Sequence, residues 1–260
     1  MDLAPQIVAA LVAVAAAAGF IDAIAGGGGL ITLPALLAAG VPPVSALATN
    51  KLQSVFGTAT ACFTYARGGH VDFRLMALPA AAAFAGSAGG AWAVQRLDSS
   101  FLGAFAPVML IAISAYFLFS PRMSEVDRHS RLRPAAYGLV ALAIGFYDGF
   151  FGPGAGSFYA VSLISLLGLG LIRATAHTKV LNVMSNLAAL LVMAAGGHVL
   201  WLLGLSMAAG NIVGGRVGSM TAMRFGGRVI KPILVIVSLT LTVKLLTDPD
   251  NPLARLILAR

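Results

Sequence analysis

Apolar residues run along the whole chain in stretches long enough to cross a lipid bilayer, and short polar loops separate them. In each half the pattern predicts an apolar segment that ends in glycines (about 5–25 and 135–151), then a short apolar piece (30–40 and 156–170). Three longer segments follow in each half, at about 44–66, 75–95 and 101–120, and at 174–195, 199–221 and 229–247. Because a membrane-crossing helix needs roughly 20 apolar residues, we expect an all-α polytopic membrane protein with about eight full spans and two short or re-entrant helices.

The composition indicates the same class of protein. Hydrophobic residues make up 59% of the 260 residues and charged residues 10%, whereas soluble domains are about half apolar and a quarter charged. The net charge of +8 comes from Lys and Arg residues that lie singly in the short loops. That arrangement orients a membrane protein and differs from the clustered basic patch of a nucleic-acid-binding protein. We expect the lipid bilayer, and no nucleic acid, as a partner.

The two halves of the chain repeat each other. Gly19–Asp22 recurs with one change as Gly145–Asp148, and each tetrapeptide precedes a glycine-rich stretch. In the same order, Ala48–Lys51 matches Ala176–Lys179, and the run Gly-Gly-His-Val at 68–71 recurs at 196–199. Ordered matches at an offset of about 126 to 128 residues indicate an internal duplication. We divide the chain into a first transmembrane repeat (1–120), a cytoplasmic linker (121–133), a second repeat (134–247) and a C-terminal tail (248–260).

Equivalent loops in the two halves carry opposite charge. Loop 67–74 is basic while its counterpart 196–200 has no Lys or Arg, and loop 41–44 is neutral while its counterpart 171–174 carries Arg173. Lys and Arg collect on the cytoplasmic side of a membrane, so inverted repeats require this opposite bias. The total count of basic residues hardly separates inverted from parallel repeats. The paired loops favour two inverted repeats with both termini periplasmic.

Glycines interrupt each half near the end of its first apolar segment, at 26–29 and 152–156. Glycine is unfavourable inside a helix, and a break at membrane depth requires protein or a watery cavity to satisfy the freed backbone groups. Paired breaks in two halves point to the midplane site of a transporter. A short helix after each break would direct N–H groups near Gly28 and Gly154 at an anion. The alternative is a tight helix crossing that needs small residues.

Each half also places one acid and one lysine within its apolar sequence. Asp22 and Asp148 are functional candidates, because an acid inside a membrane segment is costly; the alternatives are a structural partner of the glycine break and a coupling site for protons. Lys51 and Lys179 have three readings: contact with an anion, snorkelling to the interface, or pairing with the aspartate of their own repeat.

Polar residues surround both lysines. By the three-and-four spacing of a helix, positions 50, 51 and 54 share one face, as do positions 178, 179, 182 and 186. Two such faces, each with one cation, would meet across a pseudo-twofold axis and enclose a small anion. The candidate substrate-binding residues are Lys51, Lys179, Thr49, Asn50, Gln53, His177, Asn182, Gly28 and Gly154.

The chain carries no recognised enzyme motif. Gly152–Ser157 is glycine-rich, but no Gly-Lys-Ser/Thr follows it, so it is not a phosphate-binding loop. Neither Gly-x-Ser-x-Gly nor His-Glu-x-x-His occurs. Asp22 and Asp148 leave an intramembrane aspartyl hydrolase as an alternative, but that chemistry gives the lysines no role. We expect no catalysis, no metal and no cofactor.

The motifs around both glycine breaks resemble those of the TauE/SafE sulfite exporter family, also called the TSUP family. The first half contributes Gly19–Asp22, Gly26–Gly29 and Ala48–Gln53, and the second contributes Gly145–Gly154 and Ala174–Asn182. The resemblance covers essentially the whole chain. It implies a permease of the bacterial inner membrane with two repeats that moves sulfite, organosulfonates or related sulfur-containing anions, usually outward.

Together these features predict a secondary transporter that works by alternating access between the two repeats and exports a small anionic substrate. An uncoupled anion channel and a transporter of small carboxylates are the alternatives, and a homodimer is a further partner that the sequence leaves open.

Overall fold

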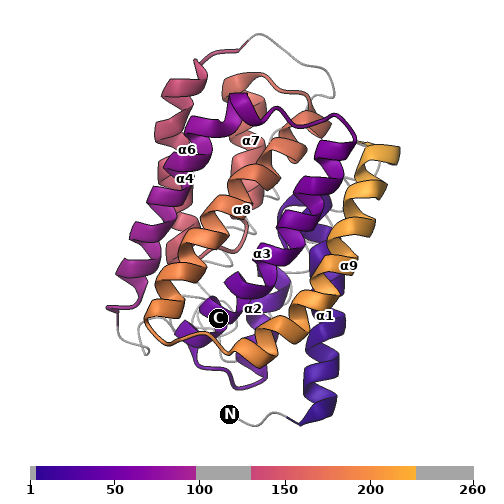
Figure 1. Cartoon of the computed structure of the whole chain (residues 1–260), viewed down its shortest axis with the longest axis vertical. Coiled ribbons are helices and arrows are strands. Elements are labelled where there is room, and N and C mark those ends of the chain that lie inside the picture. Colours follow the sequence, from indigo (N-terminus) through magenta and orange to yellow (C-terminus); the bar gives the residue numbers. More distant parts are fainter. Residues whose placement is uncertain (1–3, 98–129, 227–260) are drawn as a thin grey trace, which may run out of the picture.

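The computed structural model describes residues 4–97 and 130–226, and every regular element within them is an α-helix (Figure 1). We call residues 4–97 the N-segment and residues 130–226 the C-segment. The N-segment forms α1 (Pro5–Ala25), α2 (Gly29–Ala38), α3 (Pro43–Arg67) and α4 (Phe73–Val94). The C-segment forms α6 (Pro134–Phe150), α7 (Ala155–Leu167), α8 (Leu171–Ala195) and α9 (Trp201–Phe225).

Each predicted apolar segment within the described residues is a helix, with ends that differ from the expected ones by a few residues. The predicted segments 101–120 and 229–247, most of the linker 121–133 and the tail 248–260 lie outside the described residues.

Prolines and glycines set the helix boundaries. Pro5, Pro43 and Pro134 occupy the first turns of α1, α3 and α6, where a residue without an N–H group costs no hydrogen bond. α1 ends at Gly26 (φ 78°), and Gly154 (φ 83°) immediately precedes α7. Glycine enters this left-handed region without the steric cost of a side chain. The two glycine stretches therefore let the chain turn from α1 into α2 and from α6 into α7.

The helices form two sets that run in opposite directions (Figure 1). α1, α3 and α9 run one way, and α4, α6 and α8 run the other. The crossing of α3 and α8 shows the reversal in its hydrogen bonds. Thr49, near the start of α3, accepts from the Leu200 N–H just after the end of α8 (3.3 Å). The Asp72 N–H, just after the end of α3, donates to His177 Nε2 near the start of α8 (3.0 Å).

The most extensive helix contacts join the two segments, with α1 along α9 and α4 along α6. Glycines let these backbones touch. A Cβ atom on Gly214 would overlap the carbonyl oxygen of Ala16, and one on Gly90 would overlap that of Phe146. Glycine at these positions therefore allows close helix packing.

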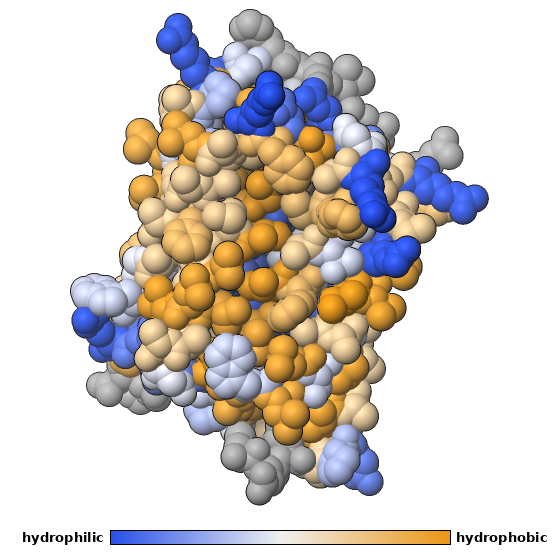
Figure 2. Space-filling model, viewed as in Figure 1, coloured by the Kyte–Doolittle hydropathy of each residue, from blue (hydrophilic) through white to orange (hydrophobic). Residues whose placement is uncertain are grey.

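Large apolar side chains cover much of the outer surface. Figure 2 shows them over the middle of the visible face, with hydrophilic residues towards the ends. Leu139 and Leu202 are 76% and 85% exposed, which suits contact with lipid. Among the described helices, α1, α4 and α8 are long and apolar enough to cross a membrane by length and composition. α3 and α9 are long but carry more polar residues, and α6 has 17 residues, so the count of about eight spans stays a prediction.

Arginines gather at one end of the helix bundle, where the ends of α3 and α9 meet the starts of α4, α6 and α8 (Figure 1). They are Arg67, Arg74, Arg131, Arg133, Arg173 and Arg224. Arg96 lies at the opposite end, with its guanidinium 3.3 Å from the centre of the Trp92 ring. Within the described residues, the two ends of the bundle therefore differ strongly in positive charge.

Candidate functional site

The two glycine breaks meet inside the bundle. The Ser157 N–H donates to the Gly26 carbonyl oxygen (3.1 Å), and Ser157 Oγ donates to the Ala25 carbonyl oxygen (2.7 Å). A Cβ atom on Gly26 would lie 2.5 Å from the Gly156 carbonyl carbon. The two backbones can come this close only because both residues are glycines. The hydrogen bonds of Ser157 then join the start of α7 to the end of α1.

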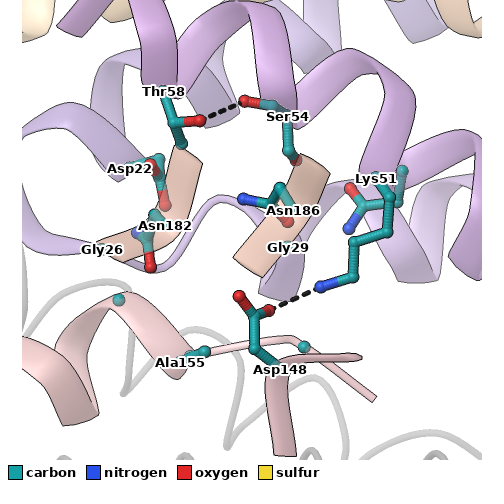
Figure 3. A pocket seen from close by; sticks show the side chains of 14 residues that line it. Asp22, Gly26, Gly29, Lys51, Ser54, Thr58, Asp148, Ala155, Asn182 and Asn186 are labelled. Atoms are coloured by element: carbon teal, nitrogen blue, oxygen red, sulfur yellow. Dashed lines mark hydrogen bonds and ion pairs between the residues drawn. The ribbon is translucent and has the colours of Figure 1, made fainter. Parts of the chain in front are cut away.

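A small cavity lies at this junction (Figure 3). The space open to the centres of water molecules is about 30 Å³, and about 10–15 Å³ is enough for one water. The cavity therefore has room for a couple of waters or one small ion. It is lined by Asp22, Gly26, Gly29, Asn50, Lys51, Ser54, Thr58, Asp148, Gly152, Gly154, Ala155, Gly156, Asn182 and Asn186.

A tight ion pair forms one wall of the cavity. Lys51 Nζ on α3 lies 2.5 Å from Asp148 Oδ1 on α6, and their side chains are 1% and 5% exposed. Figure 3 shows the lysine reaching across to the carboxylate. Ser185 Oγ on α8 donates to the other oxygen, Asp148 Oδ2. Both oxygens of this buried carboxylate are thus occupied by donors.

The second ion pair is looser. Lys179 Nζ lies 3.2 Å from Asp22 Oδ2 and also donates to the backbone oxygen of Asp22. The other carboxylate oxygen, Asp22 Oδ1, accepts from the Gly28 N–H at 3.3 Å. The Asp22 side chain is 20% exposed, four times the value for Asp148. The two aspartates occupy equivalent places in the sequence, but the structure holds them differently.

Both ion pairs join the N-segment to the C-segment. The alternative that each lysine pairs with the aspartate of its own repeat is therefore wrong. α3 and α8 run antiparallel beside the cavity. Each lysine therefore faces the aspartate of the other segment: Lys51 faces Asp148, and Lys179 faces Asp22. Each lysine already has a carboxylate partner. With all four groups ionised, the net charge of the cluster is zero.

The structure divides the predicted site residues into two groups. Asp22, Lys51, Asp148, Asn50, Asn182 and Gly154 line the cavity, whereas Lys179, Gly28, Thr49, Gln53 and His177 do not.

Three of the residues that do not line the cavity make hydrogen bonds to its lining or to loops at the ends of the helices. Thr49 and His177 bind the loops at the two ends of the bundle. Gln53 bridges Asn50 and the Asn211 amide of α9.

Residues that carry hydrogen-bond donors line the cavity from both segments. Asn50 Oδ1 accepts from Thr32 Oγ1 (2.5 Å) and from Gln53 Nε2 (2.8 Å). This fixes the orientation of the amide and leaves its nitrogen near Gly29. Within the described residues, the backbone N–H groups of Gly29 and Gly156 at the starts of α2 and α7 have no acceptor. Free N–H groups at helix N-termini, together with an amide nitrogen, suit an anion.

One buried acceptor also lacks a partner. Asn182 lines the cavity, is 3% exposed, and its Oδ1 atom has no hydrogen-bond donor among the described residues. A buried polar atom without a partner is costly, so this oxygen marks a place for a donor that binds in the cavity.

The candidate substrate-binding residues leave out several residues of the lining, although positions 54 and 186 share the predicted faces of the lysines. Ser54 and Thr58 on α3 occupy the same positions relative to Lys51 as Asn182 and Asn186 on α8 do relative to Lys179. The signal was present, because steps of three and seven residues keep a side chain on the face of the lysine. Ser185, which holds Asp148, follows no such rule, since the equivalent position in the N-segment is Gly57.

Apolar helices around a buried, charged cavity define a helical membrane protein with an internal polar site, and the comparisons with known proteins give its class. The pattern of the "Sulfite exporter TauE/SafE" family matches residues 11–245. The chain is 48% identical over 253 residues to the "Probable membrane transporter protein ORF9" of Sinorhizobium sp, covering 97% of each chain. It is 44% identical over 247 residues to the "Probable membrane transporter protein YfcA" of Escherichia coli (strain K12), covering 95% of this chain and 92% of that one.

A "Probable membrane transporter protein" of Haemophilus influenzae is 43% identical over 249 residues, 95% of this chain and 98% of that one. No solved structure matches. The chain is a membrane transporter, and it belongs to the sulfite exporter TauE/SafE family.

Proposed function

We propose that this protein is a secondary transporter that exports small sulfur-containing anions, such as sulfite or organosulfonates, by alternating access. The observation that carries the proposal is the cavity where α2 and α7 begin. Free backbone N–H groups of Gly29 and Gly156 and the Asn50 amide offer donors there. Its size, about 30 Å³ for water centres, suits an anion with few non-hydrogen atoms.

The helix directions support two inverted repeats as the moving parts. α1, α2, α3 and α4 correspond in order and length to α6, α7, α8 and α9. Equivalent helices run in opposite directions, as α1 and α6 do (Figure 1). Each repeat contributes one lysine and one aspartate to the cluster at the cavity. Alternating access in this arrangement is a rocking of one repeat against the other around a fixed central site.

The charge difference between the ends of the bundle supports an orientation in the bacterial inner membrane. The positive-inside rule favours a cytoplasmic location for the end that carries Arg67, Arg74 and Arg173. The start of α1 lies at the opposite end (Figure 1), which supports a periplasmic N-terminus. Export would then carry the anion from the arginine-rich end to the other.

The first test is the thermal stability of the purified protein with sulfite, sulfate, thiosulfate, methanesulfonate, acetate and chloride at constant ionic strength. An anion at about a hundred times its dissociation constant adds roughly 2.7 kcal/mol of stability. We expect selective stabilisation by a sulfur-containing anion, and we expect Asn50→Leu to abolish it. His198→Asn, at the end of the bundle, is the matched control that keeps it. A shift with acetate alone would assign the site to carboxylates instead.

Counterflow in liposomes separates a carrier from a channel. A carrier loaded inside with unlabelled sulfite takes up labelled sulfite transiently above its equilibrium level. A channel shows no such overshoot, and its absence would refute the alternating-access part of the proposal while leaving the anion site intact.

A further inference from the structure

The two aspartates of the central cluster are held so differently that they have different tasks. Asp148 is bound at both oxygens, by Lys51 at 2.5 Å and by Ser185. Asp22 has one longer ion pair of 3.2 Å and one backbone hydrogen bond of 3.3 Å, and its side chain is more exposed to the cavity. A proton added to Asp148 would have to displace a donor, whereas Asp22 meets weaker competition.

One difference in sequence between the two segments explains why Asp148 has a hydroxyl donor and Asp22 has none. The position equivalent to Ser185 is Gly57, which has no hydroxyl group to donate to Asp22. The space beside Gly57 is filled by Asn211 of α9, so a Cβ atom there would overlap the amide. Asn211 itself is held by Gln53. The packing between α3 and α9 thus prevents Asp22 from gaining the second strong donor that Asp148 has.

We propose that Asp22 is the site where a proton binds to couple anion transport to proton movement, while Asp148 stays ionised; this rests on the function proposed above. With all four groups ionised, the cluster of Asp22, Lys51, Asp148 and Lys179 has a net charge of zero. A proton on Asp22 raises that charge to +1. One singly charged anion then restores neutrality, which avoids the large cost of an unbalanced charge in a buried site. Proton and anion then cross together, so net export is driven by the outward concentration gradient of the anion itself.

The surroundings of Asp22 fit this exchange. Lys179 keeps a partner after protonation, because its Nζ also donates to the Asp22 backbone oxygen at the end of α1. The negative end of the α1 dipole favours a cation there. Asn182, whose Oδ1 atom has no partner among the described residues, lines the same cavity and has room to accept a hydrogen bond there. That donor is supplied by a protonated carboxyl group or by a water attached to it.

Within the described residues, few other ionisable groups face Asp22. Lys179 faces it from α8, and Tyr65 on α3 donates its hydroxyl to the neighbouring Ala23 carbonyl oxygen. Cys62 on α3 lies near Lys179, and the pair of Lys51 and Asp148 lies across the cavity. Neither α2 nor α7 carries a charged residue, and Arg216 of α9 is exposed.

The first experiment needs no anion. Infrared difference spectra of the purified protein on acidification report the C=O band of protonated carboxyl groups. We expect one component of that band to disappear in Asp22→Asn and to persist in Asp72→Asn, which alters an exposed acid outside the cavity. Ser185→Ala removes the second donor to Asp148 and is expected to add a component. A spectrum unchanged by Asp22→Asn would overturn the proposal whatever the transport results.

The second experiment uses methanesulfonate, whose charge stays constant with pH. A difference of about one pH unit should drive about a tenfold accumulation in liposomes, independent of membrane potential because the net charge moved is zero. Asp22→Asn should abolish this accumulation and make methanesulfonate binding independent of pH, while Asp72→Asn keeps the wild-type pH profile. Accumulation driven by a sodium gradient alone would overturn the proton assignment. A wild type that neither binds nor exchanges methanesulfonate counts against the proposed function for that anion, and the infrared result still decides the proton site.

Discussion

Removing one partner of the Lys51–Asp148 pair should destabilise the protein far more than removing both. The two charged atoms lie 2.5 Å apart and are almost fully buried. At an effective dielectric constant of about 20, their attraction is about 7 kcal/mol. Most of it offsets the cost of burying the two charges, so the net value of the pair is small. A single substitution leaves the other charge buried without a partner, which costs about 3–5 kcal/mol.

The assay is a double-mutant cycle of the free energy of unfolding in mixed micelles, with helix content from circular dichroism as the signal. Asp148→Asn and Lys51→Met should each cost about 3–5 kcal/mol. The double variant should cost less than either single variant, and so far less than their sum, because neither charge remains. Asn in place of Asp148 keeps the shape of the side chain and still accepts from Ser185.

The same cycle on Lys179 and Asp22 is the matched comparison. That pair is longer, 3.2 Å, and its acid is 20% exposed, so water screens it and the coupling energy should be smaller. If the effects of Lys51→Met and Asp148→Asn simply add, the pair does not act as a unit, and our account of the cluster is wrong.

Three further predictions concern packing, the junction of the breaks and a helix cap. Gly214→Ala should cost about 1–3 kcal/mol because the new methyl group meets the Ala16 backbone, whereas Gly138→Ala, with its nearest atoms 3.9 Å away, should be neutral or stabilising. Ser157→Ala removes a hydroxyl donor shared between the Ala25 and Gly26 carbonyl oxygens at the end of α1 and should cost about 1–3 kcal/mol. Hydrogen bonds from the N–H groups at the start of α4 lower the pKa of the Asp72 carboxyl from 3.8. Its stabilising effect is present above the unfolded pKa and is lost as pH falls through the folded pKa, so Asp72→Ala should destabilise more at about pH 6 than at about pH 3.

Thermal unfolding of each variant against wild type measures all three effects. Equal losses for Gly214→Ala and Gly138→Ala would contradict the packing account. A stable Ser157→Ala protein would mean that the junction does not depend on its hydroxyl group. A loss in Asp72→Ala that does not change with pH would show that the carboxylate charge plays no part in the cap.

The sequence predicts the helices well because both of their determinants are local. Apolar length fixes where a helix can cross a membrane, and glycine and proline fix where it ends or begins, as at Gly26 and Pro134 respectively. The positions of Asp22, Asp148 and Lys51 at the cavity follow from the paired breaks and from helix spacing.

The partners of these charges depend on tertiary packing and could not be read from the sequence. The sequence near Lys51 does not indicate that α3 crosses α8 antiparallel. It is this crossing that brings Lys51 to Asp148 of the other segment. Equally, Thr49 and His177 flank the lysines in sequence, but each is about half a helical turn away from the cavity face and binds a distant loop instead.

The packing of α1 against α9 has a consequence for how the chain is made. α1 is synthesised before α9, yet the glycine-lined surface that it fits belongs to α9, the last helix that the structure describes. α4 likewise receives its partner, α6, only after residues 98–129 have been made. Neither segment completes its own interior alone, so the nascent protein must hold unpaired helices in the bilayer until the final contacts form. Premature termination within the C-segment therefore removes the partner of α1 as well as the missing residues themselves.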